Sequence, residues 1–314
     1  MTRDRRRLVP LGAFLGALLV LAMVYTPLNV YNPFFRDRVE RRVYTTLVNA
    51  AGEELWATTL PVYRGDELWT GPDTRYVVQR VSRRIAYLEE APVAQFDQQP
   101  DPGQPGVALA GPGLALPLAT TARTIAVYHT HSAESFVPTQ GTHSVWANGG
   151  IIQVGAVFAQ ALEEQGFTVI HSRTPHDPHD AGAYSRSRRT ALNLIRNHRP
   201  YATFDLHRDA VPARFYRTSI DGQEVSQLML VIGRSNPLQR GNILFARRLM
   251  AVGAGLYPDL FKGLFMGRGT YNQDLDPGLL LVEAGTYLMG QPLVERGIKL
   301  LAEVVAVTAG LSGR

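Results

Sequence analysis

The sequence predicts an α/β fold in which a mostly parallel sheet is flanked by helices. Three short apolar runs, at residues 125–128, 201–204 and 279–282, carry this prediction. Runs of this kind are typical of strands that are buried on both faces of a parallel sheet. Helical patterns lie between them, as expected where helices connect parallel strands through right-handed crossovers. Because an open parallel sheet forms its site beyond the carboxyl ends of its strands, the residues after each run are candidates for function.

The first thirty residues predict a membrane anchor. Four arginines within residues 3–7 precede a nearly uninterrupted apolar stretch over 8–28. About 20 apolar residues cross a bilayer as a helix, and the basic end stays in the cytoplasm. We therefore expect a cytoplasmic tip over 1–7, a single transmembrane helix over 8–29 and an extracytoplasmic remainder. A cleaved signal peptide is the alternative, although its apolar region is normally shorter.

Residues 30–90 are expected to form a small extracytoplasmic module without catalytic side chains. The apolar segment 43–47 fits a short helix or strand, and 76–78 indicates a strand that passes into an amphipathic helix over 81–88. Residues 91–122 contain six prolines among Gly, Ala and Gln, with few charges. This composition is typical of a semi-extended linker.

Residues 123–314 are expected to form the main domain, in which strands and helices alternate. Apolar residues at helical spacing predict the helices, and Gly166 is placed to end the first of them. In chain order we expect a strand at 124–129, a helix at 151–165, a strand at 168–171, a helix at 187–197, a strand ending at 207, a strand at 227–233, a helix at 238–256, a strand at 279–282 and a helix at 293–307.

Composition restricts the chemistry. The sequence has no cysteine, which excludes disulfides and thiolate ligands, so any metal must be held by histidine and carboxylate side chains. That donor set suits zinc, iron, manganese or nickel. The net charge of +5 at pH 7 includes the basic N-terminal tip, and the remaining excess is too small to indicate a nucleic-acid partner.

Four side chains at the predicted strand ends suggest a metal-dependent hydrolytic site. His131 and Glu134 lie on the loop after the first strand, and His207 ends another strand. A hydrolytic zinc site uses three such ligands and keeps a fourth position for water. Glu283 ends a third strand and is expected to act as general base and then as acid. His129 is an alternative to His131, or a partner behind it, because residues i and i+2 of a strand point the same way.

Three further features have two interpretations each. Asn272, Gln273 and Asp274 precede the last strand, where they either bind substrate or form a turn with their own backbone. Arg208 either contacts substrate or pairs with the acid that follows it. The segment His-Asp-Pro-His-Asp at 176–180 resembles a metal site in composition, but a proline-broken loop gives it no rigid support. We expect this last segment to be solvated surface.

These segments resemble the stage II sporulation protein P family of endospore-forming bacteria. Order and spacing agree over essentially all of residues 124–308, and the anchor and the proline-rich linker also fit. The matching motifs are Tyr-His-Thr-His and Glu-Ser-Phe within 128–136, Phe-Asp-Leu-His-Arg-Asp at 204–209, Val-Ile-Gly-Arg-Ser-Asn-Pro at 231–237, Tyr-Asn-Gln-Asp-Leu-Asp-Pro-Gly at 271–278 and Leu-Leu-Val-Glu-Ala-Gly at 280–285.

The resemblance implies a zinc-dependent peptidoglycan hydrolase related to the N-acetylmuramoyl-L-alanine amidases, which cut the amide between the lactyl group of muramic acid and L-alanine. It also implies endopeptidase action on peptide cross-links and a place at the septum during engulfment of the forespore. The implied partners are stage II sporulation proteins D and M. The wider amidases carry a glutamate ligand at the start of the first helix. Here the corresponding place, near Asn148, has no acid, so Glu134 is assigned as the carboxylate ligand.

Two other functions stay open. One is a wall-binding scaffold with the same fold and no turnover, although all the catalytic-looking side chains are present. The other is a different zinc hydrolase, such as a carboxypeptidase, which would release free C-terminal D-alanine instead of intact stem peptides.

Overall fold

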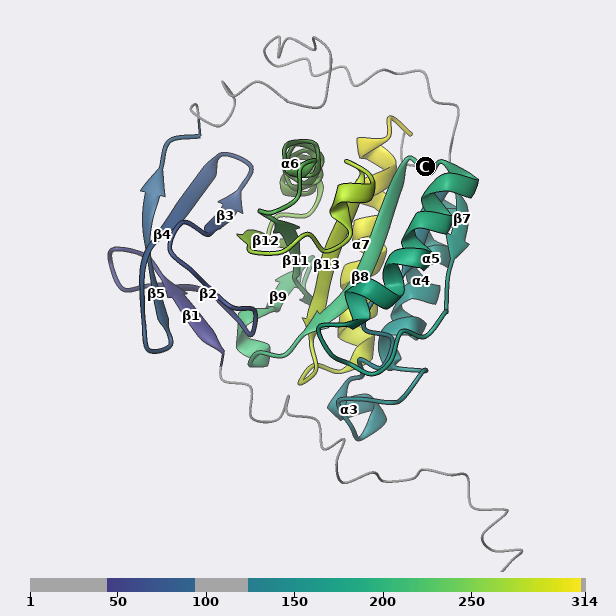
Figure 1. Ribbon diagram of the computed structural model, residues 1–314, viewed down its shortest axis with the longest axis horizontal. Coiled ribbons are helices and arrows are strands. Elements are labelled where there is room, and N and C mark those ends of the chain that lie inside the picture. The colour runs from purple at the N-terminus through teal and green to yellow at the C-terminus, as the bar shows by residue number, and fades with distance from the viewer. Residues whose placement is uncertain (1–43, 94–123, 312–314) are drawn as a thin grey trace, which may run out of the picture. The chain divides into compact units, whose positions relative to one another are not determined.

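An eleven-stranded sheet organises the residues that the computed structural model describes, 44–93 and 124–311 (Figure 1). Across the sheet the strand order is β2-β1-β5-β4-β3-β12-β11-β13-β8-β6-β7. A separate two-stranded hairpin consists of β9 (Arg217–Ile220) and β10 (Gln223–Ser226). The helices pack mainly against the strands that residues 124–311 form.

Four neighbouring strands at one side of the sheet run parallel, as the apolar runs predicted. Their register places Tyr128 beside Asp205 and His207 beside Glu283. Register partners point to the same face of a sheet, so Asp205, His207 and Glu283 share one face. The four strands are β7 (Thr168–His171), β6 (Thr124–Tyr128), β8 (Ala202–Asp209) and β13 (Leu279–Thr286).

The sheet as a whole is mixed, so the expectation of a mostly parallel sheet was wrong. β11 (Leu228–Gly233) lies antiparallel to β13, and β12 (Phe261–Gly267) runs parallel to β11. β12 was not predicted, because glycines interrupt its apolar pattern. Gly263 has a φ of +148°, and a Cβ at this position would lie 2.1 Å from the carbonyl oxygen of Trp69. A glycine inside a strand here marks the close approach of a second backbone.

The N-terminal strands extend the same sheet. β3 (Glu67–Gly71) pairs antiparallel with β12, with Trp69 opposite Leu264, and both of these side chains are fully buried. In its described part, the segment predicted as a small module over 30–90 is therefore joined to the main sheet by backbone hydrogen bonds. Its other strands are β1 (Thr45–Val48), β2 (Glu54–Thr58), β4 (Thr74–Ser82) and β5 (Ile85–Ala91).

The amphipathic helix predicted over 81–88 was wrong. β4 and β5 form a hairpin there, in which Ser82 pairs with Ile85 and Arg83 turns the chain with a φ of +54°. Val81 and Ile85 are each 38% exposed, so their spacing did not mark a buried helix face. Short apolar patterns of this kind fit strands and helices equally well.

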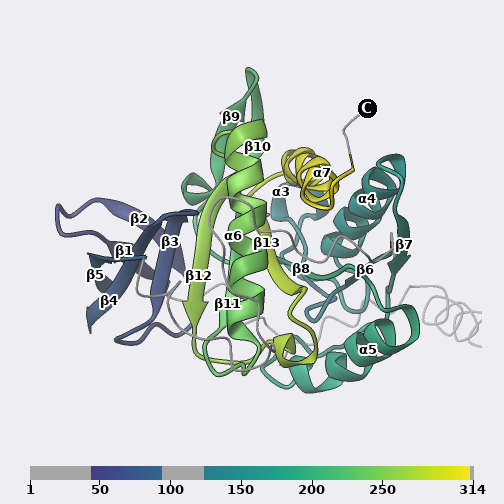
Figure 2. The same cartoon turned by 90° about the horizontal axis from the view of Figure 1, so that it is seen from above.

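The predicted helices of the main domain are all observed. α4 and α7 pack together on one face of the sheet, and α5 covers the other face (Figure 2). The side chains of β6 point alternately to the two faces of the sheet, which explains this arrangement. Ile125 and Val127 belong to one buried cluster, and Ala126 and Tyr128 belong to another. The helices are α3 (Val137–Gln140), α4 (Gly150–Glu164), α5 (Ala183–His198), α6 (Gln239–Leu256) and α7 (Gln291–Thr308), with short 3₁₀ turns η3 (Ala213–Phe215) and η4 (Gln273–Leu275).

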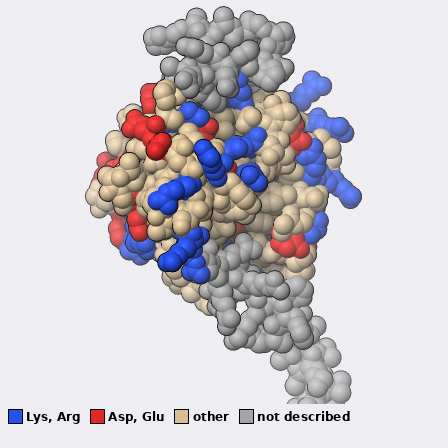
Figure 3. Space-filling model, turned by 60° about the vertical axis from the view of Figure 1, so that its left-hand side comes forward, with Lys and Arg blue, Asp and Glu red and all other residues tan. Residues whose placement is uncertain are grey.

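Charges of both signs lie on the face that Figure 3 draws, where Lys and Arg lie at the centre and along the right-hand edge and most Asp and Glu lie toward the left. Acids on or next to β3 and β4 compensate several of the arginines. The ion pairs are Arg75–Glu67 at 2.6 Å, Arg234–Asp66 at 3.0 Å and Arg247–Asp73 at 3.1 Å.

Within residues 44–93 and 124–311, no helix is both long and apolar enough to cross a membrane. The anchor predicted over 8–29 lies outside the described residues, as does the linker predicted over 91–122 except for its first three residues. Both remain predictions.

Candidate metal centre

The carboxyl ends of β8 and β13 bring two of the predicted side chains together. His207 and Glu283 are register partners on adjacent parallel strands, which lie about 4.8 Å apart in a sheet. Asp205 stands two residues before His207 and shares its face. The sheet thus presents one imidazole and two carboxyl groups at the edge where the sequence predicted the site.

The chain turns directly after β6 and brings His131 and Glu134 to the same edge. The backbone carbonyl of Glu134 accepts a 3.0 Å hydrogen bond from the N–H of Ile151, in the first turn of α4. Gly149 makes this contact possible, because a Cβ there would lie 2.2 Å from that carbonyl oxygen. Glu134 therefore reaches the start of the helix from the loop before it.

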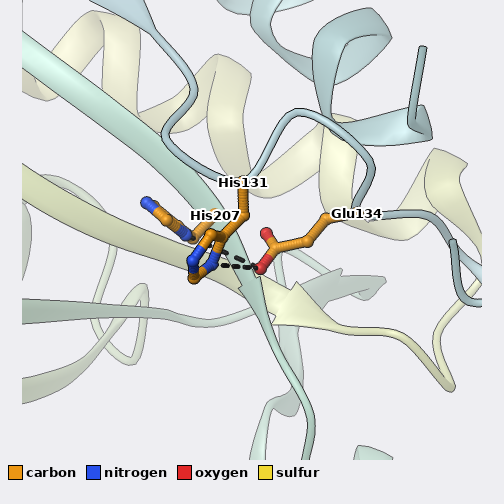
Figure 4. A group of neighbouring side chains, drawn as sticks. All are labelled: His131, Glu134 and His207. Atoms are coloured by element: carbon orange, nitrogen blue, oxygen red, sulfur yellow. Dashed lines mark hydrogen bonds and ion pairs between the residues drawn. The ribbon is translucent and has the colours of Figure 1, made fainter. Parts of the chain in front are cut away.

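The three predicted ligands form a group that could hold a metal ion (Figure 4). Nδ1 of His131 lies 3.2 Å and Nδ1 of His207 lies 3.6 Å from the same oxygen of Glu134, Oε1. The candidate ligand atoms of the group all lie within 4.8 Å of one another. The second oxygen, Oε2, accepts a 2.8 Å hydrogen bond from the backbone N–H of Arg208. This bond holds the carboxylate with Oε1 toward the two histidines.

The electrostatics of this group favour a positive charge at its centre. Burial by itself would lower the pKa of His207, but the carboxylates of Asp205 and Glu134 raise it well above its usual value. Burial opposes the ionisation of Glu134, yet His207 and His131 hold the pKa of Glu134 well below its usual range. The two carboxylates thus stabilise a cation between them, and a divalent metal ion can supply that charge in place of a proton.

Glu283 has the surroundings expected of a proton-transfer group. Burial raises the pKa of Glu283 well above its usual value, and the nearby carboxylate of Asp209 raises it further. Among the residues that the structure describes, none hydrogen-bonds the buried Oε2 of Glu283 or the buried Nε2 of His131. Buried polar atoms are normally paired, so these two atoms mark a place prepared for another molecule or ion. The histidine and carboxylate donors fit zinc.

The family assignment follows from the sequence match. A sequence model described as Stage II sporulation protein P matches residues 80–306. The chain belongs to this family. The match covers the three motifs that supply the metal group and Glu283, and it begins within β4, so it includes part of the N-terminal strands.

The solved structures to which this chain is similar are remote in sequence. The CwlD amidase from Clostridioides difficile, solved in complex with the GerS lipoprotein, is 9% identical with a TM-score of 0.42 and covers 60% of this chain and 99% of its own. The catalytic domain of CwlV, an N-acetylmuramoyl-L-alanine amidase from Bacillus (Paenibacillus) polymyxa var. colistinus, is 10% identical with a TM-score of 0.39, covering 60% and 99%. The amidase AmiC2 of Nostoc punctiforme is 13% identical with a TM-score of 0.37, covering 59% and 94%. A search of curated proteins gave no match.

In this member of the stage II sporulation protein P family, His129 and His131 point in different directions. β6 ends at Tyr128, so the two histidines do not share a strand face. Nδ1 of His129 lies 3.2 Å from the carbonyl oxygen of Leu206, and its Nε2 lies 2.8 Å from Nε2 of His171. Burial and the neighbouring His171 lower the pKa of His129 to about 3. The structure therefore places His131 in the metal group, whereas the side chain of His129 lies against Gly155 of α4.

Asp205 is a site residue to which the sequence analysis gave no role. Its Oδ1 lies 3.1 Å from Nε2 of His207, and it also accepts a 2.7 Å hydrogen bond from the backbone N–H of Thr130. The Thr130 hydroxyl donates to Oδ2 at 2.6 Å. Asp205 thus orients a predicted ligand and ties the loop that carries the others to β8. The Asp-x-His spacing on a buried strand was the available signal, since it puts both side chains on one face.

The residues predicted to bind substrate all have internal partners. Arg208 is buried, and its guanidinium donates to the carbonyl oxygens of Ser135 at 3.2 Å and His143 at 2.7 Å. It therefore holds the loop that carries Glu134.

The segment before β13 is also committed to internal bonds. The amide of Asn272 donates to the Ser187 hydroxyl at 3.1 Å, and the amide of Gln273 both accepts from Gly233 N and donates to the carbonyl of Val231. Asp274 forms a two-bond ion pair with Arg188. These partners lie far from the segment along the chain and are not its own backbone, and its role in substrate binding stays a prediction.

Apart from the exposed Asp180, the segment 176–180 is not solvated surface, so that prediction was wrong. His176 is buried, with Nδ1 2.7 Å from the carbonyl oxygen of His129 and Nε2 2.8 Å from the Thr190 hydroxyl. The Ser132 hydroxyl donates to Asp177 at 2.8 Å. These contacts supply the rigid support that the proline-containing loop was expected to lack. They bring His179 to the metal group, with its Nε2 3.7 Å from Oε1 of Glu134 and its ring centroid 4.1 Å from that of His131.

Replacing His179 with alanine is expected to weaken metal binding by about 10–100-fold, the usual effect of removing a side chain that positions ligands. The reason is that His179 packs against the ring of one ligand and faces the carboxylate of another. Competition with a chelator of known affinity measures the metal dissociation constant. His198→Ala, at the exposed end of α5, is the matched control and should change nothing. An unchanged constant in His179→Ala would show that the packing has no influence on the ligands.

Proposed function

We propose that this chain is a membrane-anchored, zinc-dependent peptidoglycan hydrolase that cleaves the amide bond between N-acetylmuramic acid and L-alanine. The observation that carries the proposal is a group of possible metal ligands that lies next to Glu283. The group consists of His131, Glu134 and His207, and Glu283 is the register partner of His207 on the adjacent strand. Membership of the stage II sporulation protein P family supports a wall substrate over other amides.

In this proposal His131, Glu134 and His207 hold the zinc ion. Zinc, when bound, lowers the pKa of water and polarises a carbonyl group. The protein holds its ligands in advance, since Arg208 N–H fixes Glu134 and Asp205 faces His207. Ligands fixed in this way bind a metal without reorganising the site.

Glu283 moves the proton. The attacking water gives a proton to the Glu283 carboxylate as its oxygen bonds to the lactyl carbonyl carbon. The carbon–nitrogen bond then breaks, and Glu283 returns the proton to the alanine nitrogen, which leaves as an amine. A raised pKa suits both halves of this exchange, because a carboxylate with a higher pKa accepts a proton more readily and can still return it to the leaving amine.

The wider setting rests on the family. We propose that residues 8–29 anchor the chain in the membrane with the described domain outside, at the septum of a sporulating cell. Stage II sporulation proteins D and M are the proposed partners, and peptide cross-links are a second proposed substrate. A wall-binding scaffold without turnover is the alternative in another functional class, and the same assay separates the two.

The test is digestion of purified peptidoglycan by the full chain, first with zinc and then after chelation, with products analysed by mass spectrometry. We expect stem peptides that carry a free L-alanine amine, lost on chelation and restored by zinc. Free D-alanine would instead identify a carboxypeptidase. No product under any condition, in a chain that still binds the wall, would favour either the scaffold or an enzyme that needs its partner protein, and repeating the digestion with the proposed partners would separate these two.

A further inference from the structure

The segment between α3 and α4 is held rigidly against the loop that carries the metal group. Its Val145 N–H donates to the carbonyl oxygen of Ala133, and its Gly149 N–H to that of Ser132, both at 2.8 Å. Ser144 pairs with Glu134 in an isolated antiparallel bridge. The segment therefore moves with a predicted metal ligand, not independently of it.

Trp146 stands out on this segment. Its side chain is 62% exposed, the highest value among the large hydrophobic side chains of the described residues. The next residue, Ala147, has a φ of +59° and donates its N–H to the carboxylate of Asp177 at 3.1 Å. A non-glycine residue in this backbone region is uncommon and requires support from its surroundings. An indole presented to solvent from such a fixed backbone is prepared for a ligand, because little ordering is left to be done on binding.

The position of Trp146 relative to the metal group follows from the pairing. Residues opposite each other in an antiparallel pair have Cα atoms about 5 Å apart, and two further residues add at most about 7 Å. Since Ser144 lies opposite Glu134, the Cα atom of Trp146 lies within about 12 Å of that of Glu134 by this estimate. A substrate that reaches the metal group with one end can lie on the indole with a neighbouring ring.

The indole face matches the chemistry of a sugar ring. A pyranose presents C–H groups on its flat sides and hydroxyl groups at its edges, and an aromatic side chain offers a broad apolar surface with a polar N–H at its rim. In the substrate of the proposed function, the scissile amide is attached to a sugar through the lactyl group. When that amide is at the metal group, a sugar ring must therefore lie close to it.

We propose that Trp146 forms a sugar subsite that binds the glycan strand of the substrate by stacking, a proposal that rests on the proposed function. The subsite lies beside the metal group and recognises the carbohydrate part, whereas the metal group acts on the amide. It would favour long glycan strands over free stem peptides.

The test uses a soluble tetramer of N-acetylglucosamine, which has no stem peptide, and isothermal titration calorimetry with the full chain. Trp146→Ala is expected to weaken tetramer binding at least tenfold, whereas Trp146→Phe retains most of it. Leu256→Ala, which removes another exposed apolar side chain (43% exposed, at the end of α6), is the matched control and should bind as the unaltered chain does. The subsite would be overturned if Trp146→Ala bound the tetramer as tightly as the unaltered chain, or if Leu256→Ala lost as much affinity as Trp146→Ala. It would also be overturned if the unaltered chain did not bind the tetramer.

Fluorescence gives an independent readout. The sequence contains three tryptophans, and Trp56 and Trp69 are buried, so a solvent-exposed emission comes from Trp146. We expect the tetramer to shift this emission to shorter wavelength. Neither measurement needs turnover, and this separates the two failures. Wall digestion without tetramer binding removes the subsite alone, and tetramer binding without digestion removes the amidase alone.

Discussion

Glu283→Gln is expected to reduce the release of stem peptides from peptidoglycan by about 10²–10⁴-fold, the usual contribution of a general acid–base group. Glutamine has the same shape, but it cannot take the proton from water or return it to the alanine nitrogen. Because burial and Asp209 raise the pKa of Glu283, the folded protein favours the neutral form of this side chain. A neutral amide should therefore leave the thermal midpoint of the metal-free protein unchanged or raise it.

Two controls make this result specific. Zinc affinity and sedimentation with insoluble peptidoglycan should match those of the unaltered chain, since Glu283 is not among the three proposed ligands. Hydrolysis at an undiminished rate would exclude Glu283 as the proton carrier. A combined loss of hydrolysis and zinc binding would instead make Glu283 part of the metal site.

His207→Ala has the second large expected effect, and it acts on metal and fold together. The zinc dissociation constant should rise by more than about 10²-fold, beyond the effect of losing a residue that only supports a ligand. In the metal-free protein the same change leaves Asp205 and Glu134 buried without their shared cationic partner. Removing one partner of a buried ion pair costs about 3–5 kcal/mol of unfolding free energy.

Chelator competition measures the first effect of His207→Ala, and urea unfolding of the metal-free protein measures the second. His198→Ala again serves as control, because this exposed histidine ends α5. Retention of tight zinc binding by His207→Ala would remove this residue from the ligand set. A fall in stability without any change in zinc affinity would give it a purely structural role.

The central strands and the metal group could be anticipated because their signals are local. A strand buried on both faces leaves a continuous apolar run, and the polar residue at its end is then conspicuous. The register of the adjacent parallel strands then places His207 beside Glu283. The N-terminal strands lacked this signal. The exposed Val81 and Ile85 imitate a helical pattern, and only long-range pairing decides that they belong to a hairpin.

His179 shows why other site residues could not be anticipated. Its place depends on bonds to residues far along the chain, such as that of Asp177 with Ser132 and that of His176 with Thr190. Each of these bonds joins side chains whose proximity exists only once the sheet has formed. A proline and two acids in a loop are typical of solvated surface, and the local composition had nothing to set against that interpretation.

The pairing of β3 with β12 affects how the protein can be divided. A fragment that begins at residue 124 would contain every residue of the metal group, but it would uncover the side of β12 that pairs with β3. The uncovered edge, Phe-Lys-Gly-Leu-Phe-Met-Gly, is mostly apolar and has free backbone N–H and C=O groups. Edges of this kind recruit strands from other molecules, so the shortened protein should self-associate. Residues 67–71 thus act as a built-in cover for an edge of the sheet that would otherwise be open to strands of other molecules.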